Sequence, residues 1–417
     1  MPGPASAASA AFSGPGRLPV SRIAARAFAH PSRPGGGNPV TVFLLGGGEG
    51  DGKGEGNDKG EGNGKGEGGG TSSLPPQSAR AALARTCAWE SVFASASSSS
   101  ASSSAGKSGR GGGRTRGAPP PSSLLAFHLP TGDEVEFCAH AALGAAAVLA
   151  GEGRAQRAGM EEAAAAADGA AVVIELVSMA DGRRHSATVQ PSGVAELRLS
   201  ASSHEEGPIL DAAITAELRE AVGLAPPGGT TGGAAEAEDG SASSASGPAA
   251  SLLPADVNSS VARPKTLVPV QDVRTLHLAT DPTDPAAFRT LCDRAGTTGL
   301  YLYAPVNTSA SAAAAVPPTA TFECRQFPRA SGYPEDPATG IAAAALAASL
   351  RRRGIGGSSA RYELLQGTAM GRPSRIGVRF GAEEGDGSCM YVSGLVEVLS
   401  REEERMEVGH VARKGRQ

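Results

Sequence analysis

Two segments of this chain would be apolar on every side of a helix, and this feature constrains the fold more than any other. The first runs from His140 to Ala150 and the second from Ile341 to Arg353, and Ala and Leu dominate both. A helix with no polar face is stable only when protein surrounds it. Strand-like sequence flanks both segments, so the pattern predicts an α+β fold in which a curled, mostly antiparallel sheet surrounds each buried apolar helix.

The two helical segments also indicate a duplication. They begin at 140 and 341, roughly 200 positions apart, which is a duplicated architecture rather than a short-period repeat. Each follows a short polar loop that comes after strand-like sequence. We therefore expect two pseudo-symmetric halves. In the second half, Thr275–Ala279 is predicted to be a strand.

Low-complexity sequence sets the expected domain boundaries. Gly (58 residues) and Pro (30) are abundant in this chain of 417 residues, and much of the bias lies in a few segments, one of which repeats Lys-Gly-Glu-Gly from Lys53. Such segments bury too little apolar surface to fold, so we interpret them as solvated insertions and linkers. The predicted organisation is a disordered leader (1–18), an N-terminal half (19–224) with disordered insertions at about 47–74 and 95–120, a flexible linker (225–261), a C-terminal half (262–402) and a polar tail (403–417).

Charge and cysteine content exclude several classes of partner. The formal net charge is −4, so no basic field favours nucleic acid or an anionic membrane. A Gly/Arg run at 107–116 contains no aromatic residue, and a solvated linker is favoured there over an RNA-binding segment. The five cysteines are scattered without metal-ligand spacing, so neither a metal site nor a disulfide framework is expected. We expect a cytoplasmic protein. The first 48 residues contain no Asp or Glu, which leaves an organellar transit segment as the alternative.

The loops that enter the two apolar helices are where chemistry is expected. Helix N-termini carry unpaired N–H groups and bind carboxylates well. If the two helices face each other, His140 and the pair Glu335-Asp336 would meet in one anion-attracting cleft. A carboxylate and an imidazole in such a cleft can transfer a proton at neutral pH. On the pattern alone, the default explanations are a helix cap for Asp336, a structural role for His140 and a surface acid for Glu90.

Five segments, in order along the chain, resemble those of one protein family. Gly37–Phe43 is similar to a GNPAAV opening, Cys138–Ala146 to CGHATLAAA, and Glu335–Gly340 matches EDPATG without a change. Gln366–Ser374 resembles a closing QG-x-x-x-GRPS stretch, and Pro264–Pro269 also fits. These segments are typical of the phenazine-biosynthesis-like (PhzF) family.

The resemblance implies a diaminopimelate epimerase-like fold with the active site between its two halves. It also implies an isomerase that needs no cofactor and moves a proton within a cyclic dihydro-hydroxyanthranilate by acid/base catalysis. Carried over by motif, Glu90 in Trp89–Phe93 would take and return the proton, and His140 and Asp336 would support it. The expected partner is a small carboxylate substrate, and whether the chain forms a homodimer stays open. Substrate binding would fall to the loop and helix-start residues Ala139, Thr339, Gly340 and Ile341.

Two departures from the family pattern bear on activity. Ala139 stands where the family has Gly before the His, and Ile341 replaces a Ser after Thr-Gly, which removes a hydroxyl from the site. The alternative function is therefore a catalytically impaired family member that binds a small molecule or a protein. The fold also hosts epimerases with two catalytic cysteines. Cys138 could be the first thiol, but the loop at Pro337–Gly340 offers no second one.

Overall fold

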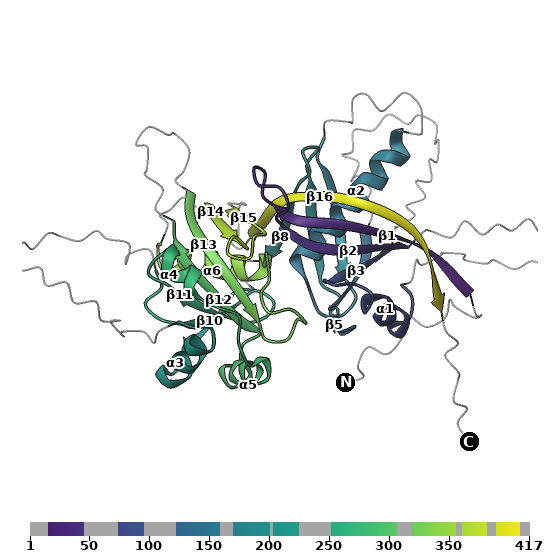
Figure 1. Ribbon diagram of the computed structural model, residues 1–417. Coiled ribbons are helices and arrows are strands. Elements are labelled where there is room, and N and C mark those ends of the chain that lie inside the picture. Colours follow the sequence, from purple (N-terminus) through teal and green to yellow (C-terminus); the bar gives the residue numbers. More distant parts are fainter. Residues whose placement is uncertain are drawn as a thin grey trace, which may run out of the picture.

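The computed structural model describes residues 16–45, 74–95, 122–158, 170–200, 203–224, 252–306, 319–355, 361–381 and 389–408. Most of the predicted leader, insertions, linker and tail therefore lies outside the described residues. The described part is a sheet-dominated α+β structure (Figure 1). Its elements are β1 (Gly16–Ala29), β2 (Asn38–Leu45), α1 (Gln77–Ala84), β3 (Ser91–Ser95), β4 (Ser122–His128), β5 (Glu134–Val135), α2 (Ala139–Ala158), β6 (Val172–Ser178), β7 (Arg184–Val189), β8 (Val194–Ser200), β9 (Glu205–Ile209), α3 (Ala212–Ala221), β10 (Val257–Ser260), β11 (Lys265–Pro269), α4 (Val273–Leu278), α5 (Pro285–Ala295), β12 (Gly299–Pro305), β13 (Thr319–Pro328), α6 (Gly340–Arg352), β14 (Arg361–Gln366), β15 (Ser374–Gly381) and β16 (Cys389–Val408).

The strands form one continuous sheet rather than the two separate sheets expected. Its order is β1-β2-β3-β4-β6-β7-β8-β16-β15-β14-β13-β12-β11-β10-β9, with β5 paired to β4. The long strand β16 joins the halves, because it pairs with β8 and β15 and also runs antiparallel to β1 (Figure 1). Pairing both of its edges satisfies backbone groups that an open edge would leave exposed.

The same order of strand pairings occurs twice. From β2 through β3, β4 and β6 to β7 the pairs are parallel, antiparallel, parallel and antiparallel. From β11 through β12, β13 and β14 to β15 the order is the same. Adjacent parallel strands need a long crossover connection. In both series the second crossover contains an apolar helix, α2 in the first and α6 in the second.

Both apolar helices lie in the core. Every residue of α6 from Gly340 to Leu350 is buried, and α2 is buried through Ala146. Small side chains let α2 approach the sheet closely. A Cβ atom added at Gly144 would lie 2.7 Å from the Val40 Cγ1 atom of β2. Such close packing explains why the helix is rich in Ala and Gly.

The predicted boundary between the halves is wrong. The segment 203–224, assigned to the N-terminal half, packs with the C-terminal half, because β9 pairs with β10. Arg219 of α3 also forms a buried ion pair with Asp256, at 2.6 Å between Nη2 and Oδ1. The predicted linker (225–261) ends too late, since β10 occupies Val257–Ser260.

Three further predictions need local correction. β1 and β16 pair out to Gly16 and Val408, so strand replaces the end of the predicted leader and the start of the predicted tail. The predicted strand at Thr275–Ala279 is instead the helix α4, because the Asp272 carboxylate accepts a hydrogen bond from the Thr275 N–H at 2.7 Å and caps it.

In the described part of the chain, no helix is long and apolar enough to cross a membrane.

Candidate active site

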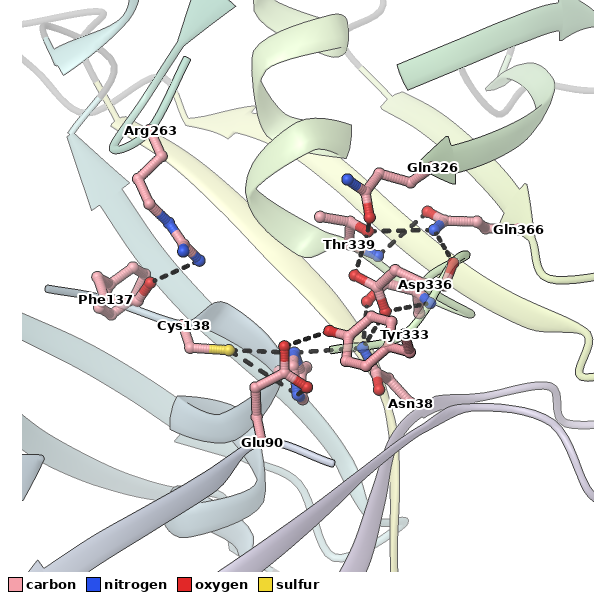
Figure 2. A network of polar contacts seen from close by, with 12 residues as sticks. Asn38, Glu90, Phe137, Cys138, Arg263, Gln326, Tyr333, Asp336, Thr339 and Gln366 are labelled. Carbon is pink, nitrogen blue, oxygen red and sulfur yellow. Dashed lines mark hydrogen bonds and ion pairs between the residues drawn. The ribbon is translucent and has the colours of Figure 1, made fainter. Parts of the chain in front are cut away.

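A cavity of about 140 Å³ lies where the two halves meet, and we call it the site pocket. Glu90, His140 and Asp336 all line it, so the structure brings together three residues from distant parts of the chain. Figure 2 shows Glu90 and Asp336 among the side chains of this region. A larger cleft of about 660 Å³ lies beside it and contains none of these three residues. Ile341 lines both spaces. We place the candidate chemistry in the smaller pocket because its titratable groups are buried there together.

The first turns of α2 and α6 meet at this pocket. A Cβ atom added at Gly340 would lie 3.1 Å from the Ala139 Cβ and 2.8 Å from the Phe28 ring, so only Gly fits there. The first-turn N–H groups of each helix have no acceptor within the helix, which makes this wall of the pocket positive. Ala139, Gly340 and Ile341 line the pocket as expected for carboxylate binding.

Thr339 also lines the pocket, but its polar groups are used by the protein. Its backbone N–H donates to Gln366 Oε1 at 3.1 Å, and its hydroxyl donates to Asp336 Oδ2 at 2.6 Å. The predicted role of Thr339 in substrate binding therefore has no support from its hydrogen bonds. Its contacts instead hold the Asp336 side chain in place.

The two carboxylate oxygens of Glu90 differ in their hydrogen bonding. The residue directly precedes β3 and is only 6% exposed. The Tyr333 hydroxyl donates to Glu90 Oε1. Glu90 Oε2 has no hydrogen-bond partner among the described residues, and it lies 3.7 Å from His140 Nε2. Burial raises the pKa of Glu90, and burial also raises the pKa of Tyr333 well above its ordinary value, so the phenol remains a donor.

Asp336 is fixed by contacts on both its backbone and its carboxylate. Its N–H donates to Gln326 O at 3.0 Å, and its carbonyl oxygen accepts from Gln366 Nε2 at 2.6 Å. Asn38 Nδ2 donates to Asp336 Oδ1 at 2.6 Å. Burial, and then the nearby Glu90 carboxylate, raise the pKa of Asp336 to about 6.

His140 is neutral, and its neighbours determine its tautomer. Burial lowers the pKa of His140 to about 4. Burial also raises the pKa of Cys138, so this residue is a thiol rather than a thiolate. The Cys138 Sγ atom lies 3.2 Å from His140 Nδ1, and Asn38 Nδ2 lies 3.3 Å from the same nitrogen. The Asn38 amide already donates both of its hydrogens, to Asp336 Oδ1 and to the Ala338 carbonyl, so the Cys138 thiol is the donor available to Nδ1. A thiol donating to Nδ1 favours the tautomer with the ring proton on Nε2, facing Glu90.

The sequence motifs supply the supports of this pocket as well as its reactive groups. Asn38, in the first motif, links Asp336 to His140. Gln366, in the last motif, holds the loop before α6 through both of its amide atoms. Gly367 has φ 77° and lies against the Arg372 carbonyl, so a side chain there would clash. The last motif therefore shapes the loop that presents Asp336.

Sequence reasoning missed several site residues and overestimated one. Tyr333 lies two residues before the start of the EDPATG segment, and this proximity to the motif was the only signal available. Lys265 and Arg263 also line the pocket. Lys265 belongs to the Pro264–Pro269 segment, which served only as a family resemblance, and Arg263 directly precedes that segment. Glu335 does not line it, because both of its oxygens accept from the buried Arg325 guanidinium, at 2.9 Å (Oε1 from Nε) and 2.7 Å (Oε2 from Nη2).

The family model for phenazine biosynthesis-like protein matches residues 238–398. This part of the chain is similar to the phenazine biosynthesis-like family. The match contains the loop with Asp336 and the segment with Lys265. Glu90 and His140 lie outside it, in the half where the family resemblance rests on short motifs. Among curated proteins, none matches the sequence significantly.

Solved structures extend the family fold over most of the chain. A predicted epimerase from Pseudomonas aeruginosa is 21% identical and covers 92% of this chain and 99% of its own, with a TM-score of 0.56. A PhzF-family phenazine biosynthesis protein from Bacillus anthracis is 15% identical and covers 93% and 99%, also with a TM-score of 0.56. A PhzF-family protein from Enterococcus faecalis is 16% identical and covers 93% and 99%, with a TM-score of 0.51. At these identities the likeness establishes the fold, and function has to be argued from the site.

Proposed function

We propose that this protein is an isomerase that moves a proton within a small cyclic carboxylate and needs no cofactor. The observation that carries the proposal is the open Glu90 Oε2 atom. This atom lies in the site pocket beside the neutral His140 ring, and burial raises the pKa of the Glu90 carboxyl. A carboxylate with these properties can remove a proton from carbon and return it. The family match of residues 238–398 supports the same reaction class.

The proposed reaction uses the two sides of the pocket differently. The substrate carboxylate binds at the N-termini of α2 and α6, where first-turn N–H groups face it. Glu90 Oε2 takes a proton from a ring carbon, and the C–H electron pair enters the conjugated system of the substrate. The Glu90 carboxyl then delivers the proton to a different carbon, so a double bond shifts and no net charge or atom changes. His140, through Nε2–H, stabilises the negative charge that develops in between, and Asp336 holds the Asn38 amide beside the His140 ring.

The repeated order of strand pairings supports two pseudo-symmetric halves as the frame for this chemistry. Each half contributes one apolar helix whose first turn borders the pocket, which gives a substrate carboxylate two sets of N–H donors. The direct test is solvent-deuterium exchange. Candidate cyclic amino and hydroxy acids are incubated with the protein in D₂O, and deuterium at carbon is followed by NMR. The proposal expects exchange at one or two ring positions. No exchange with any bound acid would favour a binding protein.

Tyr333 is expected to affect the pH dependence of this exchange. The Tyr333 hydrogen bond stabilises the Glu90 carboxylate and so lowers the pKa of Glu90. In Tyr333→Phe that pKa rises, the basic form is lost at a higher pH, and the acidic limb of the rate profile moves to higher pH. The measurement is the exchange rate across a pH series. Tyr301→Phe is the control, since Tyr301 is a buried tyrosine that does not line the pocket, whereas Tyr333 is partly buried and lines it. An unshifted limb in Tyr333→Phe would remove this tyrosine from the mechanism.

A catalytically impaired binding protein is the second candidate, and Ile341 favours it. Ile341 is 4% exposed and places branched apolar bulk where a hydroxyl would otherwise face the pocket. We expect the protein to bind small cyclic carboxylates but to turn over the phenazine precursor poorly. Ile341→Ser combined with Ala139→Gly should raise turnover of dihydro-hydroxyanthranilate by about 10²-fold or more, since a positioned proton-transfer partner contributes about 10²–10⁴-fold.

Turnover is measured by following the double-bond shift in the precursor by absorbance. Ile341→Val serves as the control, because it reduces bulk without adding a hydroxyl. If the original protein already isomerises the precursor as fast as the double variant, Ile341 does not redirect the site. In that case Glu90, His140 and Asp336 suffice for the reaction.

A further inference from the structure

Two cationic side chains line the site pocket and take no part in the reaction described above. Lys265 is 6% exposed, and its ammonium group donates to the Thr298 carbonyl at 3.1 Å. Arg263 donates from Nη2 to the Phe137 carbonyl at 3.3 Å, and its Nε has no partner among the described residues. Within the described part of the chain, neither side chain forms an ion pair. The pocket therefore contains cationic donors that the surrounding protein uses only in part.

Local backbone structure directs both side chains into the pocket. Arg263 precedes Pro264, and a residue before Pro is restricted to extended backbone. Lys265 is two positions further on and begins β11, and the chain bends at Arg263 just before this strand. Both side chains line the same cavity accordingly. Figure 2 shows Arg263 beside Phe137 and Cys138, away from Gln326 and Gln366.

Burying Lys265 without a direct ion pair is unfavourable for the protein alone, and the Asp336 and Glu90 carboxylates of the pocket offset this cost only in part. A buried ammonium with two unused N–H donors loses hydration that one backbone carbonyl does not replace. Burial accordingly lowers the pKa of Lys265 to about 7. An anionic ligand at Lys265 would supply the missing partner and favour the charged form. Arg329, which lines the same pocket, needs no such partner, because its Nε already donates to Asp293 Oδ1 at 2.5 Å.

We propose that Lys265 and Arg263 form a second anion subsite and that the ligand of this pocket is a small dianionic ring compound. One carboxylate binds at the N-termini of α2 and α6, and a second acidic group on the same ring binds at Lys265 and Arg263. The second group is a carboxylate or a phosphate-like group, since either offers the oxygens that these donors require. The description of this ligand as a substrate rests on the proposed function, whereas the subsite itself does not.

Binding calorimetry with matched ring acids tests the subsite. The probes are benzoate, isophthalate and 3-phosphonobenzoate, which share one ring and differ in the second acidic group. The original protein is expected to bind isophthalate or 3-phosphonobenzoate about 10-fold or more tightly than benzoate, as charge-assisted hydrogen bonds at a desolvated site predict. The tighter of the two dianions identifies the preferred second group.

Variants of the two cations decide whether they cause this preference. Lys265→Met should abolish the preference for the dianion and leave benzoate affinity nearly unchanged, and Arg263→Gln should reduce the preference. Arg329→Met is the matched control and should retain it. Arg263 is only partly buried, so its variant keeps the test informative if Lys265→Met does not fold by circular dichroism.

Three outcomes separate this inference from the proposed function. Equal affinity of the original protein for benzoate and both dianions overturns the subsite and leaves the isomerase proposal standing. A Lys265→Met variant that loses benzoate and isophthalate equally also overturns it, because Lys265 would then hold the first carboxylate or neutralise Glu90 and Asp336. A clear dianion preference without deuterium exchange supports the subsite and contradicts the isomerase.

Discussion

Glu90→Gln is expected to lower the rate of deuterium exchange by about 10²–10⁴-fold, the range associated with loss of a positioned proton-transfer group. The amide keeps the shape of the side chain and can still pair with the Tyr333 hydroxyl, but it cannot take a proton from carbon. Binding of small carboxylates should persist, because the N–H groups at α2 and α6 are unchanged. The measurements are the exchange rate by NMR and the affinity for benzoate by calorimetry.

Glu323→Gln provides a matched control for this substitution. The Glu323 and Glu90 side chains are both 8% exposed, and each has a His Nε2 nearby, at 3.4 Å (His277) and 3.7 Å (His140) respectively. Glu323 does not line the site pocket. Its substitution should leave the exchange rate unchanged. Equal loss in both variants would mean that a general effect of removing a buried carboxylate, rather than the position of Glu90, explains the result.

Arg325→Met is expected to lower the free energy of unfolding by about 3–5 kcal/mol, since breaking a buried ion pair leaves one charge uncompensated. Arg325 and Glu335 side chains are 7% and 5% exposed, and the guanidinium donates to both carboxylate oxygens. The same guanidinium donates to the Ala279 carbonyl, so it also ties the loop before α6 to the end of α4. Exchange activity should fall as well, because Glu335 directly precedes Asp336.

Urea unfolding of Arg325→Met, Glu335→Gln and the double variant measures this coupling. The double variant should recover part of the loss, because no isolated buried charge remains. Arg294→Met is the control. Its pair with Glu217 has a similar distance, 2.7 Å, but both side chains are exposed by more than 40%, and such a pair contributes about 0–1 kcal/mol. A similar loss in the Arg325 and Arg294 variants would contradict the assignment of a buried, structural ion pair.

The sequence was most informative where a local pattern reports burial or a defined turn. Apolar small residues on all sides of two helices predicted that α2 and α6 lie in the core, because such segments have no face suited to water. Short motifs identified Glu90, His140 and Asp336, which all line one pocket. The sequence was least informative for short segments such as Thr275–Ala279, where a single capping contact from Asp272 decides between strand and helix.

Amino-acid sequence alone determined the α+β class, the two apolar helices and the family resemblance, since these depend on residues close together in the chain. Tertiary structure decided which distant segments meet. Tyr333 reaches Glu90 across 243 positions, β9 joins the C-terminal half and β16 closes the sheet. These contacts depend on strand pairing and packing over the whole fold. Side-chain periodicity within a strand indicates which face is buried, but it does not identify the strand with which it pairs. For the same reason the cations Lys265 and Arg263 are recognised as pocket residues only once the sheet has assembled around them.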